Sequence, residues 1–368
     1  MNRKKRIPGL MLLTALFLVL VGCGDNSEET TSTNDGGSEG DYEIEVIAKG
    51  FTQQYWTAVQ NGSQEAAEEF GATINFVGPA NETAVQEQVQ MLSNAVNKNP
   101  DAIVLASLDV KAQVDLLNQA MNNEIPIVGF DSGVPEAPEG SVLGTAATNN
   151  KSAAGIAAEE IFKEIEDQLA SVSVENPARI GVLAQEANST SIVERSEGFI
   201  ETMSELASEL DNIGEQIAVV GHQRFANDVN ESDAALIIQV QIPANATDSE
   251  VQTSAQALLN MDNLLGVFSS NETASKGLLN AHEAMGGVLG SDGIVAAGFD
   301  SGTLQKEAVR NGTFLGSVTQ DPIKIGYEGV RLAIQAANGE EVDDLDVPAA
   351  WYNAENMDSD EIAPLLYD

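Results

Sequence analysis

The chain has few cysteines, histidines and aromatic residues, and these shortages remove several classes of function. A single cysteine, Cys23, excludes a disulfide framework and any cysteine-rich metal or iron–sulfur site. The two histidines, His222 and His282, lie far apart without the spacing of metal ligands, so we expect no metal and no cofactor. Aromatic residues make up only 5% of the chain, which draws attention to those that follow a predicted strand.

Basic residues are also scarce, because 17 Lys and Arg stand against 57 Asp and Glu, a formal net charge of −40. Nucleic acids need a basic face, and an anionic membrane surface repels so acidic a chain, so neither is expected as a direct partner. A surface rich in carboxylates stays hydrated in strong salt, where repulsion is screened, which predicts a saline or alkaline habitat.

Motifs for nucleotide binding and covalent catalysis are missing after the predicted strands. None of them leads into a G-x-S-x-G elbow, a P-loop or a G-x-G-x-x-G turn. The lone cysteine is explained by the anchor described next, which leaves no thiol nucleophile. We therefore expect a binding protein rather than an enzyme.

The first 22 residues read as a secretory signal. Four basic residues at 3–6 precede an apolar run at 10–21, which spans roughly 18 Å as a helix and is too short to cross a hydrocarbon core of ~30 Å. The run ends in Leu-Val-Gly-Cys at 20–23, which resembles a bacterial lipobox, so we expect cleavage before Cys23 and a lipid on its sulfur. The alternative is an ordinary signal peptide. Residues 24–41 have no apolar side chain, so 23–41 should form a disordered tether.

From Tyr42 onward, short apolar runs alternate with amphipathic stretches. Strands are expected at 44–48, 74–77, 103–106, 127–130, 180–183, 265–269 and 294–298. Helices are expected at 54–70, 83–97, 110–121, 151–169, 192–210, 273–285 and 304–311. Continuously apolar strands are typical of parallel sheets buried on both faces, so we expect an α/β fold with two doubly wound units. The segment 212–249 is harder to assign, and we expect only a strand at 234–242 there.

The pentapeptide Gly-Phe-Asp-Ser-Gly occurs twice, at 129–133 and at 298–302, each time directly after an apolar strand. Open α/β sheets bind ligands at the carboxyl ends of their strands. We therefore expect Asp131 and Asp300 to present their carboxylates to one shared cleft. The alternative is that each aspartate caps the helix that follows it.

Further polar and aromatic residues follow the predicted strands, a combination that suits sugars, whose C–H faces stack on rings and whose hydroxyls donate and accept. These segments are Gln-Gln-Tyr-Trp at 53–56, Val-Glu-Arg-Ser-Glu-Gly-Phe at 193–199, Val-Phe-Ser-Ser-Asn at 267–271 and Ser-Val-Thr-Gln-Asp-Pro at 317–322. With the two pentapeptides, they make the body from Tyr42 to Asp368 resemble the type I periplasmic sugar-binding proteins of ABC importers, the ribose-binding-like group. The lipobox makes it similar to their lipoprotein form.

The resemblance implies a role for particular residues. Tyr55 and Trp56 would stack on the sugar, and Gln53 and Arg195 would bind its hydroxyls. The remaining ligand-binding residues would be Asp131, Asn271, Phe299, Asp300 and Gln320. Tyr55 and Trp56 could instead be core residues of a helix, and Arg195 could form a surface ion pair with a neighbouring acid.

The chain departs from the family pattern at several positions, and a further family aromatic residue of the second lobe has no clear match near 243–248. Lys49 stands where the family usually has a small residue, Gln53 replaces a common Asn, and Ser132 follows Asp131 where ribose receptors have a basic residue. The identity of the sugar, a pentose, a hexose or a related polyol, therefore stays open.

The resemblance also implies an architecture and a partner. The first lobe would hold 42–148 and 321–348, the second 149–320 and 349–368, with a three-crossing hinge near Thr148, Gln320 and Pro348. A monomer would bind sugar between the lobes, without catalysis, and deliver it to an ABC permease from the extracytoplasmic face of the cell membrane. A sensory co-receptor that presents a sugar or furanosyl signal to a kinase or chemoreceptor is the alternative. An enzyme on this fold fits less well because nucleophile and metal motifs are missing, and a LacI-type regulator fits less well because the chain begins with a secretion signal.

Overall fold

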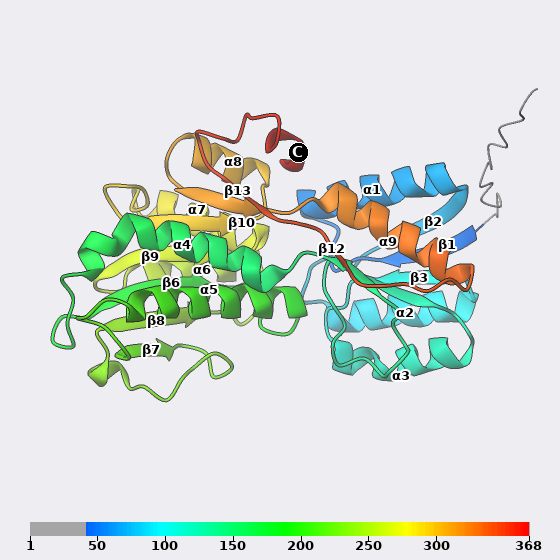
Figure 1. The fold of residues 1–368 in the computed structure, drawn as a ribbon, viewed down its shortest axis with the longest axis horizontal. Coiled ribbons are helices and arrows are strands. Elements are labelled where there is room, and N and C mark those ends of the chain that lie inside the picture. Colours follow the sequence, from blue (N-terminus) through cyan, green and yellow to red (C-terminus); the bar gives the residue numbers. More distant parts are fainter. Residues whose placement is uncertain (1–41, 368) are drawn as a thin grey trace, which may run out of the picture. The chain divides into compact units, whose positions relative to one another are not determined.

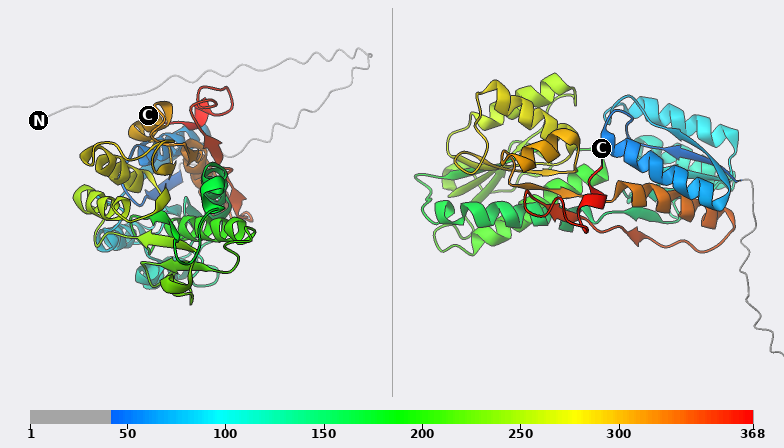
Figure 2. Two further views of the ribbon diagram at one scale, coloured as in Figure 1. Left: turned by 90° about the vertical axis from the view of Figure 1, so that its left-hand side faces the viewer. Right: turned by 90° about the horizontal axis from the view of Figure 1, so that it is seen from above.

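The structure is a computed structural model that describes residues 42–367, within one compact unit of residues 39–368. The predicted signal peptide, Cys23 and the tether lie outside the described residues. Residues 42–367 form two lobes, each an α/β layer structure around its own sheet (Figure 1). Seen from above, in the right-hand view of Figure 2, the elements of the two sheets form two groups side by side, joined by crossing segments. Between residues 42 and 367, none of the helices is long and apolar enough to cross a membrane.

The first lobe contains a six-stranded sheet in the order β12-β5-β4-β3-β1-β2, in which all pairs are parallel. Its strands are β1 (Tyr42–Ile47), β2 (Ala72–Val77), β3 (Ala102–Leu105), β4 (Ile127–Phe130), β5 (Thr145–Ala147) and β12 (Leu345–Asp346). Its helices are α1 (Gln54–Phe70), α2 (Val85–Lys98), α3 (Val110–Asn122) and α9 (Pro322–Ala337).

Helices cover both faces of this sheet, which explains why its strands are apolar at every position. In β3, Val104 packs into a core with α1 and α9, whereas Ile103 and Leu105 pack into a second core with α2 and α3. Successive strand residues point to opposite faces, so a strand covered on both sides needs an apolar residue at each step.

The second lobe contains a seven-stranded sheet in the order β13-β11-β10-β9-β6-β8-β7. Its strands are β6 (Ala178–Leu183), β7 (Ile217–Val220), β8 (Leu236–Gln241), β9 (Leu264–Ser269), β10 (Val295–Phe299), β11 (Gly316–Thr319) and β13 (Ala350–Tyr352). Its helices are α4 (Asn150–Leu169), α5 (Thr190–Ser208), α6 (Asp248–Leu259), α7 (Glu272–Ala284) and α8 (Thr303–Arg310), and two short 3-10 helices lie at η1 (Glu231–Asp233) and η2 (Ala363–Leu365). One core lies under α4 and α5, and another under α6, α7 and α8.

The predicted α/β fold with two parallel-sheet lobes is confirmed, with one correction at the sheet edge. The last strand, β13, runs antiparallel to β11 and pairs Trp351 with Val318. The chain changes sheet between β5 and α4, between β11 and α9, and between β12 and β13.

Most predicted elements are observed within a few residues of their expected bounds, and the helix at 54–70 is reproduced at both ends. The predicted strand at 234–242 is observed as β8. Elements that we did not predict are β5, β7, α6, β11, α9, β12 and β13. Several of these strands are two to four residues long, and β5 and β11 consist of small or hydroxylated residues, so neither shows a strong apolar signal.

Candidate ligand-binding site

A narrow cavity of about 20 Å³, room for about one water molecule, lies where the carboxyl ends of strands from both sheets meet. Side chains from both lobes line it. They are Lys49, Gln53, Tyr55, Trp56, Glu82, Asp131, Ile192, Arg195, Asn271, Glu272, Asp300 and Gln320. Lys49, Asp131, Asn271, Asp300 and Gln320 follow the ends of β1, β4, β9, β10 and β11, which is the edge where open α/β sheets bind ligands.

The aspartates of the repeated pentapeptide line this same cavity, one from each lobe. Both have left-handed backbone conformations, with φ of 61° at Asp131 and 80° at Asp300, which Asp tolerates better than most residues. The alternative that Asp300 caps the following helix is wrong, because the N-cap residue of α8 is Gly302. Asp131 precedes a loop and the short strand β5 rather than a helix.

Asp131 is held by a network within the first lobe and one contact to the second. Its carboxylate accepts hydrogen bonds from the Tyr55 hydroxyl at 2.6 Å and from the Lys49 ammonium at 2.7 Å. Lys49 also donates to Ser191 Oγ at 2.7 Å, in the first turn of α5. Burial by itself would raise the pKa of Asp131, but the charges of Lys49 and Arg195 lower it overall, so the carboxylate stays ionised.

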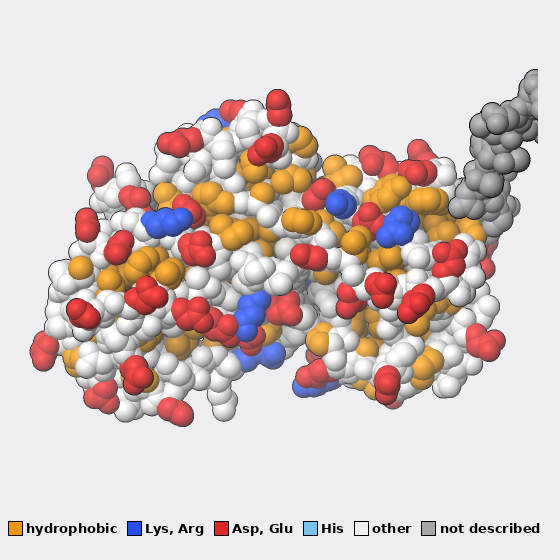
Figure 3. Space-filling view, viewed as in Figure 1, with side chains coloured by type: hydrophobic (Ala, Val, Ile, Leu, Met, Phe, Trp, Pro, Cys, Tyr) orange, Lys and Arg blue, Asp and Glu red, His pale blue; other side chains and the backbone are white. Residues whose placement is uncertain are grey.

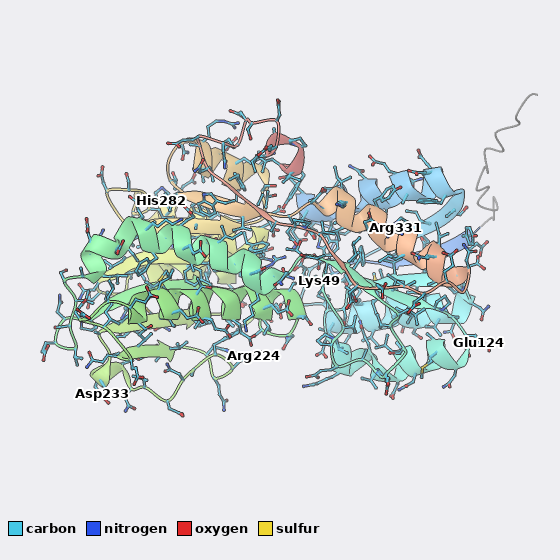
Figure 4. All side chains as sticks on the ribbon, viewed as in Figure 1. Lys49, Glu124, Arg224, Asp233, His282 and Arg331 are labelled. Carbon is cyan, nitrogen blue, oxygen red and sulfur yellow. The ribbon has the colours of Figure 1, made fainter. Side chains whose placement is uncertain are left out.

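The cation beside Asp131 is Lys49, which follows the end of β1, and the residue next to Asp131 is Ser132. Figure 4 shows Lys49 between the two lobes. The Lys49 side chain is only 3% exposed, so its ion pair with Asp131 is buried.

Tyr55 and Trp56 line the cavity and also belong to the core of the first lobe, so the two expectations for them are not exclusive. Their rings meet edge to face with centroids 5.1 Å apart. The Trp56 indole donates to Glu82 Oε1 at 2.7 Å, and Glu82 accepts a further bond from the Gln185 amide of the second lobe. Hydrogen bonds hold both rings in place at the cavity wall.

Arg195 is buried, so the alternative of a surface ion pair is wrong; its guanidinium is fixed on several sides. It donates to Asn150 Oδ1 at 2.8 Å and to the Ser270 carbonyl at 3.2 Å. It lies 3.8 Å above the ring centroid of Phe299, and 3.7 Å from Asp300 Oδ2. Phe299 is not among the residues that line the cavity; it supports Arg195 from below.

Asp300 has the opposite electrostatic balance to Asp131. Burial raises its pKa, and the Arg195 charge and the Gln320 amide, which donates to its Oδ1 at 2.9 Å, only partly counteract this. Asn271 accepts from Ala274 N at 2.9 Å and so forms the N-cap of α7.

Several buried acceptors around the cavity have no hydrogen-bond partner among residues 42–367. These atoms are the side-chain carbonyl oxygens of Gln53, Gln185 and Gln320, together with the Ser270 hydroxyl. A buried polar atom without a partner carries a free-energy cost of about 1–3 kcal/mol, which a ligand with several donors would relieve. Hydroxyl groups of a small polyol match this requirement.

Sequence reasoning missed Glu82, Gln185, Ile192 and Glu272 as parts of this site, and treated Lys49 only as a departure. Glu272 could have been found from its position, because it directly follows Asn271 after a predicted strand. Glu82 lies in a long polar loop after β2, and only the tertiary fold brings it to the cavity.

Comparison with known proteins places the chain in a family. The periplasmic binding protein domain matches residues 44–341. A D-allose-binding periplasmic protein of Escherichia coli is 22% identical over 313 residues, which cover 83% of this chain and 87% of that protein. A fructose import binding protein of Bifidobacterium longum is 28% identical over 188 residues, and the chain spans about half of it, 54%.

Solved structures are similar over most of the chain. A protein of Brachyspira murdochii, described as an ABC transporter, LacI family transcriptional regulator, is 35% identical with a TM-score of 0.73, over 89% of this chain and 99% of that one. An ABC transporter solute-binding protein of Agrobacterium vitis with bound D-fucose is 27% identical with a TM-score of 0.72, over 88% of this chain and 100% of that one.

Two parallel-sheet lobes with a polar cavity between their strand ends form the architecture of a two-lobed binding protein. The chain belongs to the type I sugar-binding group of the periplasmic binding protein family, whose members act outside the cytoplasmic membrane. The expected resemblance to this family is therefore confirmed, while the lipoprotein form stays a prediction.

Proposed function

We propose that the protein is a solute-binding lipoprotein that captures a simple sugar between its lobes and delivers it to an ABC importer permease. The single observation that carries this is the cavity between the strand ends of both lobes. Its carboxylates, unpartnered amide oxygens and aromatic walls suit a neutral ligand with several hydroxyl groups. The D-fucose bound to the Agrobacterium relative supports a monosaccharide.

We propose specific roles for the lining residues. Tyr55 and Trp56 stack on the sugar ring, and Asp131 and Asp300 accept from its hydroxyls. Arg195, Asn271, Gln53 and Gln320 complete the hydrogen bonds, and Phe299 acts through Arg195. The cavity residues lie close to one another from both lobes, which supports a shared ligand.

We also propose that ligand binding closes the lobes about a hinge near Thr148, Gln320 and Pro348. The first lobe then holds 42–148 and 321–348, and the second 149–320 and 349–368. The three changes of sheet support this, since they are the segments through which the chain passes from one lobe to the other. A sugar that contacts both lobes favours the closed form through its differential affinity.

The anchor is part of the same proposal. We propose that cleavage before Cys23 and lipidation of its sulfur hold the monomer on the extracytoplasmic face of the membrane. The mass of the protein from membranes should exceed that of residues 23–368 by the lipid, and Cys23→Ala should release it. An unmodified mass would contradict the anchor without touching the sugar site.

A binding screen tests the proposed ligand class. Residues 24–368 would be assayed by thermal shift and calorimetry against pentoses, hexoses, cyclitols and nucleosides, with D-fucose, D-allose and D-fructose included. A single class that raises the melting temperature by several degrees supports the proposal, since only binding to the native state does so. Loss of that shift in Asp131→Asn would place the ligand in the cavity. No shift with any sugar would contradict it.

A further inference from the structure

Two helices at the boundary of the lobes begin without a capping side chain of their own. The N-cap residue of α1, Gln53, makes no side-chain hydrogen bond to the helix, and the first turn has no acidic residue. The N-cap residue of α8 is Gly302, which has no side chain to offer. The first N–H groups of a helix lack partners within the helix, so these two N-termini need acceptors from elsewhere.

The acceptors come from the opposite lobe in both cases. Glu272 of the second lobe accepts from Gln54 N at 3.4 Å and from Tyr55 N at 3.3 Å, at the start of α1. Gln54 of the first lobe accepts in turn from Thr303 N at 2.8 Å and from Thr303 Oγ1 at 3.0 Å, at the start of α8. The exchange is reciprocal, because Gln54 is both the first residue of α1 and the cap of α8.

Among the helices of residues 42–367, α2 and α5 also have no side-chain hydrogen bond from their N-cap residues, Ala84 and Ser189, but five others are capped locally. The helices α3, α4, α6, α7 and α9 are each capped by the side chain of their own N-cap residue, namely Asp109, Asn149, Thr247, Asn271 and Asp321. Those caps are local and do not depend on how the lobes are placed. The caps of α1 and α8 exist only while the lobes are in contact.

We propose that Glu272 and Gln54 are positioning residues that couple closure of the lobes to helix capping. Closure gives α1 and α8 the N-terminal caps that they lack in the open form. Because capping stabilises the closed form, it raises the affinity for sugar. The proposal rests on the proposed function, since affinity gains from closure only where a ligand binds between the lobes. Gln54 does not line the cavity, so its contribution passes entirely through closure. A helix cap contributes about 0.5–2 kcal/mol, or roughly 2- to 30-fold in the dissociation constant.

The charges around Glu272 make this cap sensitive to pH. Its own backbone N–H donates to Asp300 Oδ2 at 3.1 Å, and Glu82 faces it from the loop after β2. Tyr352 of β13 and Tyr367 near the chain end lie within its field, and Asp131, Lys49 and Arg195 line the same cavity. Burial, then the Asp300 charge, raises the pKa of Glu272 from 4.5 to about 7, although the N–H groups of Tyr55 and Gln54 lower it.

The sign of the pH effect follows from the two states. In the open form Glu272 meets water and returns to its ordinary pKa, so closure raises that pKa and takes up a proton. Proton uptake by Glu272 therefore favours the closed form most strongly below pH 4.5. This favourable contribution to the free energy of closure is lost between pH 4.5 and 7, and it does not change further above pH 7. Glu272→Gln keeps an oxygen that can accept from α1 but cannot titrate.

The experiment is calorimetry of residues 24–368 with D-fucose and D-allose between pH 5 and 8. Gln54→Ala should raise the dissociation constant about 3- to 10-fold, whereas Gln54→Glu should restore it, since a carboxylate also caps a helix N-terminus. The matched control is Gln64→Ala, on the exposed side of α1. Glu272→Gln should flatten the fall in affinity between pH 5 and 7, while the exposed Glu283→Gln, on the same helix as Glu272, should leave it unchanged.

The outcomes separate this proposal from the proposed function. Equal affinities of Gln54→Ala and Gln64→Ala, or the wild-type pH profile in Glu272→Gln, would overturn the capping proposal while the sugar site stands. If neither sugar binds the wild type, the proposed function fails for them, and small-angle scattering of the same variants still decides the capping proposal. Gln54→Ala should then increase the radius of gyration relative to Gln64→Ala, and an unchanged radius would overturn it.

Discussion

Single charged residues in this protein depend on partners that come from distant parts of the chain. Asp131 and Lys49 are separated by several secondary-structure elements, yet their charged groups are 2.7 Å apart and nearly inaccessible to water. A buried charge without its partner destabilises the folded state, so the folded protein needs both residues of the pair.

The first prediction concerns that pair. Lys49→Met should reduce the unfolding free energy by about 3–5 kcal/mol, because it leaves the Asp131 carboxylate buried without its cation. The double variant Lys49→Met/Asp131→Asn should recover most of the loss. Urea denaturation measures both, with Lys111→Met as the control, since its ion pair with Glu136 is exposed and should contribute little. Similar losses in the single and double variants would refute this reading.

The second prediction concerns the support of Arg195. Phe299→Leu removes the ring below the guanidinium and should raise the dissociation constant of a bound sugar about 2- to 30-fold, the range of a cation–π contact. Phe314→Leu changes an equally buried phenylalanine in another core and should affect stability but not affinity. Calorimetry distinguishes them, and equal affinities would count against the supporting role of Phe299.

At the scale of elements, α1 and α9 pack so closely that their backbones touch. A Cβ at Gly326 would lie 2.0 Å from the Val59 carbonyl oxygen, and one at Gly62 would lie 1.8 Å from that of Ile323. Neither position can accept a side chain unless the helices move apart. This contact fixes the position of α1 and, through it, of the two aromatic residues at the cavity.

The third prediction follows from that contact. Gly326→Ala should reduce the unfolding free energy by at least about 1–3 kcal/mol, because overpacking has to displace backbone rather than a flexible side chain. Gly133→Ala is the matched control, since its new methyl group would meet only Pro135 at 3.9 Å. Thermal denaturation compares the two, and equal melting temperatures would show that α1 and α9 can separate without cost.

At the scale of the whole molecule, the acidic excess is spread over the surface rather than gathered at the site. Figure 3 shows carboxylates over both lobes of the visible face and few Lys or Arg side chains. Repulsion among exposed like charges destabilises the folded state and is screened by salt.

The fourth prediction is a stabilisation by salt. The melting temperature should rise between low and molar sodium chloride, because screening reduces the self-repulsion of a chain with a net charge of −40. Potassium chloride should act alike, since the effect depends on ionic strength. A melting temperature that does not rise would contradict both this account and the predicted saline or alkaline habitat.

What the sequence by itself determined is the part of the protein set by local patterns. The continuously apolar runs predicted parallel strands, amphipathic spacing predicted helices such as 54–70, and the repeated pentapeptide indicated two related strand ends. These signals are readable because each depends on residues that are neighbours in the chain.

Only the tertiary structure decided which side chains meet. Glu82 accepts a hydrogen bond from Trp56, Lys49 forms an ion pair with Asp131, and the caps of α1 and α8 come from the opposite lobe. The short strands β5, β12 and β13 pair with strands that are distant in the sequence or follow a long loop, β12 with β5 and β13 with β11. Such contacts depend on how two sheets are placed in space, and no local pattern of residues encodes that distance.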